Sequence, residues 1–165
     1  MGDESDPLGM SKLCRQFVAG NLKYARAIYS LFVPTLNCYK RRRPHTFSPS
    51  NISWGVEDRS ALIRIKGGSI ASRHVEQRAP SGLSNPYLVA AGTLAAGLLG
   101  IRERLALTIP PSGDVPAEDD DRHEPLRAIL GDEFCDIWTT VRRYELQRFD
   151  DHVTDGERDE YLEIY

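Results

Sequence analysis

A change of hydrophobic period along the chain constrains its fold more than any other feature. Between residues 51 and 78, apolar side chains recur at every second position, which is typical of β-strands with one buried face. Residues 57–59 and 67–69 carry the polar residues and glycines that turns favour. Because connections of only a few residues join antiparallel neighbours, the pattern predicts three short antiparallel strands.

Helical patterns flank this strand region on both sides. Apolar residues recur at three- and four-residue steps over residues 10–32, which predicts one amphipathic helix that ends before Pro34. An Asn-Pro pair opens an Ala-, Leu- and Gly-rich segment, so a second helix is expected over residues 85–105. A third is expected over residues 132–149. Helices around a short antiparallel sheet indicate an α+β domain.

Size and charge narrow the class of protein. The chain has 165 residues and a net charge of −3, which argues against a general nucleic-acid or membrane-surface binder. Its most apolar stretch, residues 87–101, is shorter than the roughly 20 residues that span a bilayer. The N-terminus lacks a signal-peptide pattern and the three cysteines are widely spaced, so we expect a reduced, cytoplasmic protein. Residues 108–123 are acidic and predict a flexible loop.

The strand region is unusually rich in arginine. Four arginines lie in or beside the predicted strands: Arg59, Arg64, Arg73 and Arg78. Guanidinium groups suit phosphate and carboxylate, and a cluster of them indicates a shared anionic partner. Glu76 and Arg78 lie two residues apart on one predicted strand and therefore share a face, where a carboxylate could hold a metal next to an anion. The same arginines could instead form surface pairs with neighbouring acidic residues, and the residues alone leave both interpretations open.

Other motifs of catalysis or binding are missing from the sequence. The histidines and cysteines show no spacing typical of zinc, and no P-loop, GxSxG or GxGxxG motif is present. The basic run at residues 40–43 is typical of a solvated loop, because the acidic charge balance of the chain weighs against a nucleic-acid patch.

Four motifs in order carry a resemblance to a known family. They are Asn37-Cys38-Tyr39-Lys40-Arg41, the segment NISWGVEDRSALIR at residues 51–64, RHVEQR at residues 73–78, and Asn85-Pro86-Tyr87-Leu88. With their spacing, they resemble the C-terminal part of the glutamine synthetase catalytic domain. The helical segments 9–25 and 131–149 are also similar, so the resemblance covers nearly all of residues 1–165. It implies an α+β fold in which an antiparallel sheet with packed helices forms one wall of a funnel for ATP, glutamate and divalent metals.

The resemblance also implies a reaction and roles for individual residues. Glutamate's γ-carboxylate is phosphorylated by ATP, and ammonia or an amine then displaces the phosphate. Arg59 is implied to be catalytic, between glutamate and the transferring phosphoryl group, and Glu76 to be a ligand for Mg²⁺ or Mn²⁺. These roles agree with phosphoryl transfer, which needs charge neutralisation more than covalent help. The implied glutamate-binding residues are Arg41, Arg59 and Arg78, and the implied ATP-binding residues are Arg59, Arg64 and Arg73.

The flap after the Tyr-Lys-Arg motif bears on the amine substrate. Ammonia-using members carry a glutamate there, whereas alignment of Pro44 and Pro49 puts Phe47 in that place. An aromatic residue is more similar to the branch that ligates glutamate to larger amines such as polyamines. Ammonia and a larger amine therefore stay as alternatives.

The N-terminal β-grasp domain and the upstream half of the family's catalytic domain have no counterpart in residues 1–165. Those parts supply most of the metal ligands, so Glu76 would be a lone ligand and we expect the isolated chain to lack activity. We expect a C-terminal fragment, a truncated product or a misplaced start of an enzyme that is a homo-oligomeric ring at full length and acts on small molecules. The alternative is a non-catalytic relic or interaction piece of a full-length homologue, which predicts exposed apolar surface.

Overall fold

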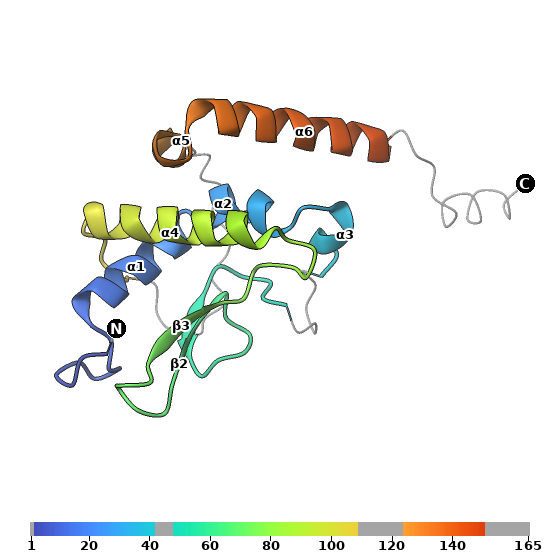
Figure 1. Cartoon of the computed structure of the whole chain (residues 1–165). Coiled ribbons are helices and arrows are strands. Elements are labelled where there is room, and N and C mark those ends of the chain that lie inside the picture. Colours follow the sequence, from blue (N-terminus) through green and yellow to red (C-terminus); the bar gives the residue numbers. More distant parts are fainter. Residues whose placement is uncertain (1, 42–47, 109–123, 151–165) are drawn as a thin grey trace, which may run out of the picture. The chain divides into compact units, whose positions relative to one another are not determined.

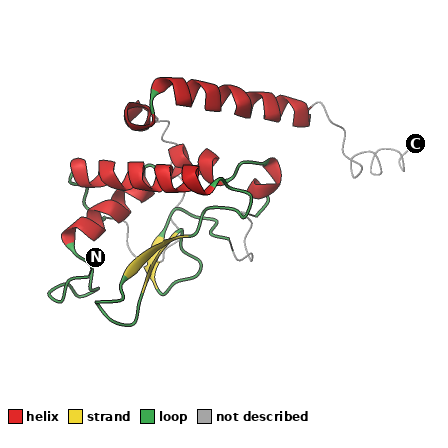
Figure 2. Cartoon of the chain, in the orientation of Figure 1, coloured by secondary structure: helices red, strands yellow, loops and turns green. Residues whose placement is uncertain are grey.

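The structure, a computed structural model, describes residues 2–41, 48–108 and 124–150 (Figure 1). The chain forms two units, residues 1–129 and residues 130–165. Helices together with a small three-stranded sheet confirm the predicted α+β class (Figure 2). The elements of the described residues, in chain order, are α1 (Lys12–Lys23), α2 (Ala25–Phe32), α3 (Leu36–Tyr39), β1 (Trp54–Val56), β2 (Ile63–Lys66), β3 (His74–Gln77), α4 (Pro86–Arg102), α5 (Glu124–Leu130) and α6 (Asp132–Asp150).

The single helix predicted over residues 10–32 is two helices, α1 and α2, that meet at Tyr24. The backbone there has φ −97° and ψ 11°, which departs from the α-helix. The Tyr24 hydroxyl lies 2.6 Å from Glu103 Oε1, and Lys23 Nζ donates to Glu103 Oε2 at 2.8 Å. Both helices pack against α4. The apolar period continues across the bend because both helices bury a face, so the sequence pattern did not reveal the break.

Helices α1 and α4 cross with their backbones in contact. A Cβ atom placed on Gly100 would lie 2.7 Å from the Cα of Gly20, a distance that real Cβ atoms essentially never show. The buried side chain of Asn21 joins the same two helices, because its Nδ2 donates to the carbonyl oxygens of Phe17 at 3.0 Å and Thr93 at 3.2 Å. The small residues of α4 thus serve close helix packing.

The sheet has β2 at its centre, and its two pairings differ in direction. β3 runs antiparallel to β2, with Arg64 opposite Glu76, which confirms the prediction for this pair. β1 runs parallel to β2, with Trp54 opposite Ile63, so the prediction of an antiparallel pair is wrong here. Parallel neighbours normally need a connection of a dozen or more residues. Because β1 has only three residues, the short segment 57–62 is enough to lead the chain back to the start of β2.

The remaining predictions concern helix ends and loops. The expected cap of α4 is confirmed, since Asn85 Oδ1 accepts hydrogen bonds from the backbone N–H groups of Tyr87 at 2.9 Å and Leu88 at 3.4 Å. The helix ends at Arg102 rather than near Leu105, and α6 confirms the helix expected over residues 132–149. The short helices α3 and α5 were not predicted.

Most of the acidic loop expected at residues 108–123 lies outside the described residues. None of the described helices is long and apolar enough to cross a membrane.

The close crossing of α1 and α4 predicts that even a methyl side chain at Gly100 destabilises the fold. We expect Gly100→Ala to lower the free energy of unfolding by about 1 to 3 kcal/mol, because the new methyl group must push α1 and α4 apart. Urea denaturation of the whole chain measures this change. Gly68→Ala is the matched control, since a Cβ there meets nothing within 4 Å. Equal stability of the two variants would contradict the tight crossing.

Candidate functional site

Charged side chains form a row across β2 and β3. Arg64 Nη1 donates to Glu76 Oε2 at 3.3 Å, and Arg78 Nε lies 3.8 Å from Glu76 Oε1. The prediction that Glu76 and Arg78 share a face is therefore confirmed. Arg64 continues the row toward β1, where its Nη2 donates to Glu57 Oε2 at 2.5 Å. We call Glu57, Arg64, Glu76 and Arg78 the ion-pair row.

Glu57 is held from two directions. Its Oε1 accepts a hydrogen bond from the backbone N–H of Gly67 at 3.0 Å, while its Oε2 accepts from Arg64. The Gly67 N–H and then the Arg64 guanidinium lower the pKa of the Glu57 carboxyl. The same hydrogen bond, which Arg64 donates to Glu57, raises the pKa of Arg64. Glu57 and Arg64 therefore favour their charged forms, and the pairs of Arg64 with Glu57 and Glu76 agree with the ion-pair interpretation that the sequence left open.

Arg59 differs from the other predicted site residues. It is exposed in the segment between β1 and β2, and no described residue pairs with its guanidinium. Next to it, Asp58 Oδ1 accepts from the N–H and the hydroxyl of Ser60, both at 2.7 Å, which stabilises the turn that carries Arg59. Arg59 is therefore a cation that an incoming anion can reach.

Arg41 is brought to the segment that follows β3, where Arg78 begins. Its Nη1 donates to the carbonyl oxygen of Pro80 at 3.4 Å, and Arg78 Nη1 donates to the carbonyl oxygen of Ala61 at 3.5 Å. The structure therefore places two of the predicted glutamate-binding arginines within the same part of the fold. The flap residue Phe47 lies outside the described residues.

Cys38 is a residue of this region that sequence reasoning missed. Its buried Sγ lies 3.0 Å from Thr35 Oγ1 and 3.1 Å from Ser81 Oγ, and so joins α3 to the segment after β3. Burial alone would raise the pKa of the Cys38 thiol, but the hydrogen bonds with Ser81 and Thr35 lower it overall. The sequence signal that could have identified Cys38 was its position in the first motif, three residues before Arg41.

Arg73 is not joined to the row. Its guanidinium lies against Gly9 near the N-terminus, and its buried Nε has no hydrogen-bond partner in the described part of the chain. Gly9 has φ +65°, and a Cβ there would lie 3.0 Å from Arg73 Nη2. The structure thus gives Arg73 a packing contact at the far end of β3, and its implied ATP contact stays a prediction.

The described residues do not by themselves make a metal site. No group of three His, Cys, Asp or Glu side chains among them is close enough to hold a metal ion. Glu76 is engaged by two arginines, and one carboxylate does not satisfy a cation that takes six or more oxygen ligands. A divalent ion at Glu76 would need ligands from elsewhere.

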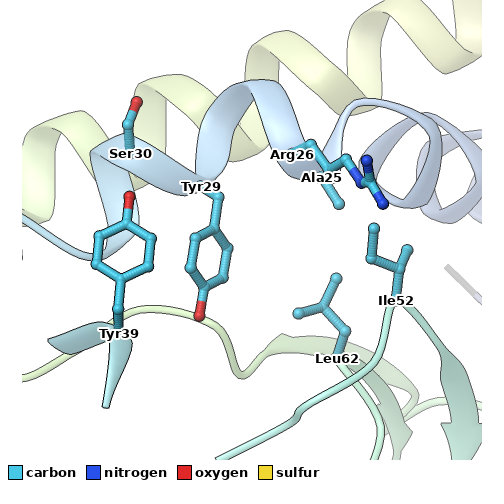
Figure 3. A pocket seen from close by; sticks show the side chains of 7 residues that line it. All are labelled: Ala25, Arg26, Tyr29, Ser30, Tyr39, Ile52 and Leu62. Carbon is cyan, nitrogen blue, oxygen red and sulfur yellow. The ribbon is translucent and has the colours of Figure 1, made fainter. Parts of the chain in front are cut away.

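A separate cavity of about 180 Å³ lies against α2 (Figure 3). Tyr29 and Tyr39 line one end, with ring centroids 5.8 Å apart in an edge-to-face arrangement, and Arg26, Ile52 and Leu62 lie around the other. Its residues come from separate segments of the chain, so no local sequence pattern predicted it.

The ion-pair row makes a prediction about titration. We expect Arg64→Met to raise the pKa of Glu57 toward its ordinary value of 4.5, because the Arg64 hydrogen bond and charge are lost while Gly67 stays. Carboxyl ¹³C NMR during a pH titration measures this. The control Arg15→Met breaks the separate ion pair with Asp6 and should leave Glu57 unchanged. An unshifted Glu57 in Arg64→Met would count against the pair.

Comparison with known proteins identifies the family to which the chain belongs. The sequence profile of "Glutamine synthetase, catalytic domain" matches residues 1–124. Gamma-glutamylethanolamide synthetase GlnA4 of Streptomyces coelicolor is 37% identical over 164 residues, which cover 90% of this chain and 35% of that protein. The glutamine synthetase of Thermotoga maritima is 42% identical over 124 residues, covering 75% of this chain and 28% of that protein.

A solved structure supports the same relationship. "Apo GmaS without ligand" matches with a TM-score of 0.79 and 25% identity, over 97% of this chain and 40% of that one. The chain spans about a third of the length of the curated relatives it matches. The resemblance read from the four motifs is confirmed: the chain belongs to the family of the glutamine synthetase catalytic domain.

Proposed function

We propose that this chain supplies one wall of the active site of an ATP-dependent ligase that joins ammonia or an amine to the γ-carboxylate of glutamate. The observation that carries the proposal is the ion-pair row on the sheet, together with the exposed Arg59 in the segment between β1 and β2. Family membership supports the reaction class, because the curated relatives are named as glutamine synthetases and a gamma-glutamylethanolamide synthetase.

The proposed reaction has two steps. A γ-carboxylate oxygen of glutamate attacks the γ-phosphorus of ATP, the bond to the bridging oxygen breaks and ADP leaves. The amine nitrogen then attacks the acyl carbon of γ-glutamyl phosphate, phosphate departs and the nitrogen loses a proton. Arg59 neutralises charge on the phosphoryl group in transit, while Arg41 and Arg78 hold the carboxylates of glutamate. Arg64 contacts the phosphates of the nucleotide.

The proposal includes a divalent metal ion and a homo-oligomeric assembly. Mg²⁺ or Mn²⁺ would be bound at Glu76 together with ligands from outside this chain, since the described residues supply no complete set. The full-length form would be a cytoplasmic homo-oligomeric ring.

The proposal also concerns which amine is joined to glutamate. The name of the Streptomyces coelicolor relative refers to ethanolamine as the amine of that protein's product. Together with Phe47 in the flap motif, this favours an amine larger than ammonia for the present chain. A panel of ammonia, ethanolamine and polyamines in one assay would rank the candidates.

Arg59 gives the sharpest test of the ligase. The corresponding segment of the Streptomyces coelicolor relative can be replaced by this chain, and product formation followed with hydroxylamine as the amine. We expect Arg59→Ala to lower turnover by about 10²-fold or more, because the phosphoryl charge is no longer neutralised. The thermal midpoint should not change, since Arg59 is exposed. Lys12→Ala, an exposed cation at the start of α1, is the control. Unchanged turnover in Arg59→Ala would remove Arg59 from the mechanism.

A second candidate function, an interaction piece, is favoured by one observation. Three large apolar residues of α4 are exposed: Tyr87 at 82%, Leu94 at 55% and Leu98 at 56%. Apolar surface of this kind marks an interaction site. If the chain acts by binding a full-length homologue, the two should co-elute in gel filtration, and Leu94→Ser with Leu98→Ser should abolish the complex. Formation of γ-glutamyl hydroxamate by the isolated chain would instead overturn our expectation that it is too incomplete to catalyse.

A further inference from the structure

Two N–H donors converge on one carboxylate at the end of β1. Arg64 Nη2 lies 2.5 Å from Glu57 Oε2, and the backbone nitrogen of Gly67 lies 3.0 Å from Glu57 Oε1. A guanidinium and a backbone N–H aimed at the two oxygens of one anion is an arrangement that also binds phosphate oxygens. The Glu57 carboxylate therefore fills a position suited to an anion that comes from outside the chain.

Most of the Arg64 side chain is shielded from solvent. Only 11% of its side chain is exposed, and its Nη1 is already bonded to Glu76. The Glu57 side chain, in contrast, is 49% exposed, so its carboxylate can turn into solvent without disturbing the core. A phosphate can reach Arg64 Nη2 once Glu57 has left it.

The backbone around this position favours the exchange. Glu57 has φ +54°, a left-handed conformation that non-glycine residues rarely adopt, and its N–H is fixed by a 2.9 Å hydrogen bond to the carbonyl oxygen of Ile65. The side chain therefore starts from a fixed point at the end of β1. On the other side, the turn is open at Gly68, because a Cβ there would meet nothing within 4 Å. The position is thus accessible from solvent along the turn.

We propose that Glu57 is a built-in competitor for phosphate: its carboxylate occupies an anion site formed by Arg64 Nη2 and the Gly67 N–H, and a phosphate oxygen of a nucleotide replaces it on binding. This inference rests on the proposed function, in which Arg64 contacts the nucleotide. The ion-pair row carries two positive and two negative side chains and is neutral without a ligand. When the Glu57 carboxylate turns away, Arg64 offers an uncompensated donor to the phosphate, and Glu76 keeps its guanidinium in place.

The test uses the whole 165-residue chain with MgADP and, separately, inorganic tripolyphosphate. Isothermal titration measures affinity, and NMR follows the Gly67 amide and the Arg64 Nη signals. We expect both ligands to shift these signals. Glu57→Gln should bind both about fivefold more tightly, because no ion pair has to be broken. Glu57→Gly should bind both ligands more tightly in the same way. Because glycine readily adopts the positive φ of this position, Glu57→Gly replaces Glu57→Gln in the test if Glu57→Gln folds poorly.

Asp58→Asn is the matched control, since it removes a neighbouring carboxylate that accepts from Ser60 rather than from Arg64. A gain in affinity as large in Asp58→Asn as in Glu57→Gln would mean a general charge effect and would overturn the inference. Unchanged or weaker binding in Glu57→Gln would also overturn it, because Glu57 would then merely position Arg64. Tighter binding of tripolyphosphate alone would assign the site to free phosphates rather than to a nucleotide. If no variant binds either ligand, the inference fails, whereas the proposed function is tested separately by the turnover of Arg59→Ala in the chimera.

Discussion

The guanidinium of Arg64, buried on the central strand, is the group on which the rest of the site depends. A buried cation is costly unless carboxylates pair with it. Glu57 comes to it from the parallel partner β1, and Glu76 comes from the antiparallel partner β3. The charge requirement of one arginine thus helps to hold the three strands in register, and Glu76 also brings Arg78 into the ion-pair row.

The segment after β3 links this sheet to the helices. The N–H of Ser81 donates to the carbonyl oxygen of Phe32 at 2.9 Å, and the hydroxyl of Ser84 donates to the same oxygen. Phe32 is the last residue of α2, so these bonds satisfy a carbonyl that a helix end leaves unpaired. Cys38 adds a contact from α3 to Ser81. Helix capping and the placement of Arg41 near Arg78 are therefore consequences of one set of contacts.

The proposed ligase function gives the ion-pair row a chemical role. Phosphoryl transfer to a carboxylate brings together anions that repel each other, so the protein must supply cations in a fixed arrangement. Arg64, the cation that the proposed function assigns to the nucleotide phosphates, is balanced in the structure by Glu57 and Glu76, which stabilises a partly buried charged cluster. Under the proposed function, the residues that pair with each other here are the ones that would meet the anionic substrates.

The sequence alone determined most of the helices and strands and the candidate site residues, because the hydrophobic period, the Asn85 cap and the motifs with Arg59, Arg64 and Glu76 are local patterns. Tertiary structure decided the rest. The bend at Tyr24 depends on contacts with Glu103, which is 79 residues away in the chain. The parallel direction of β1, the pairing of Glu57 with Arg64 and the separation of Arg73 from the row likewise depend on how distant segments pack. Periodicity reports which face of an element is buried but not which partner covers it, and that is the physical reason for the division.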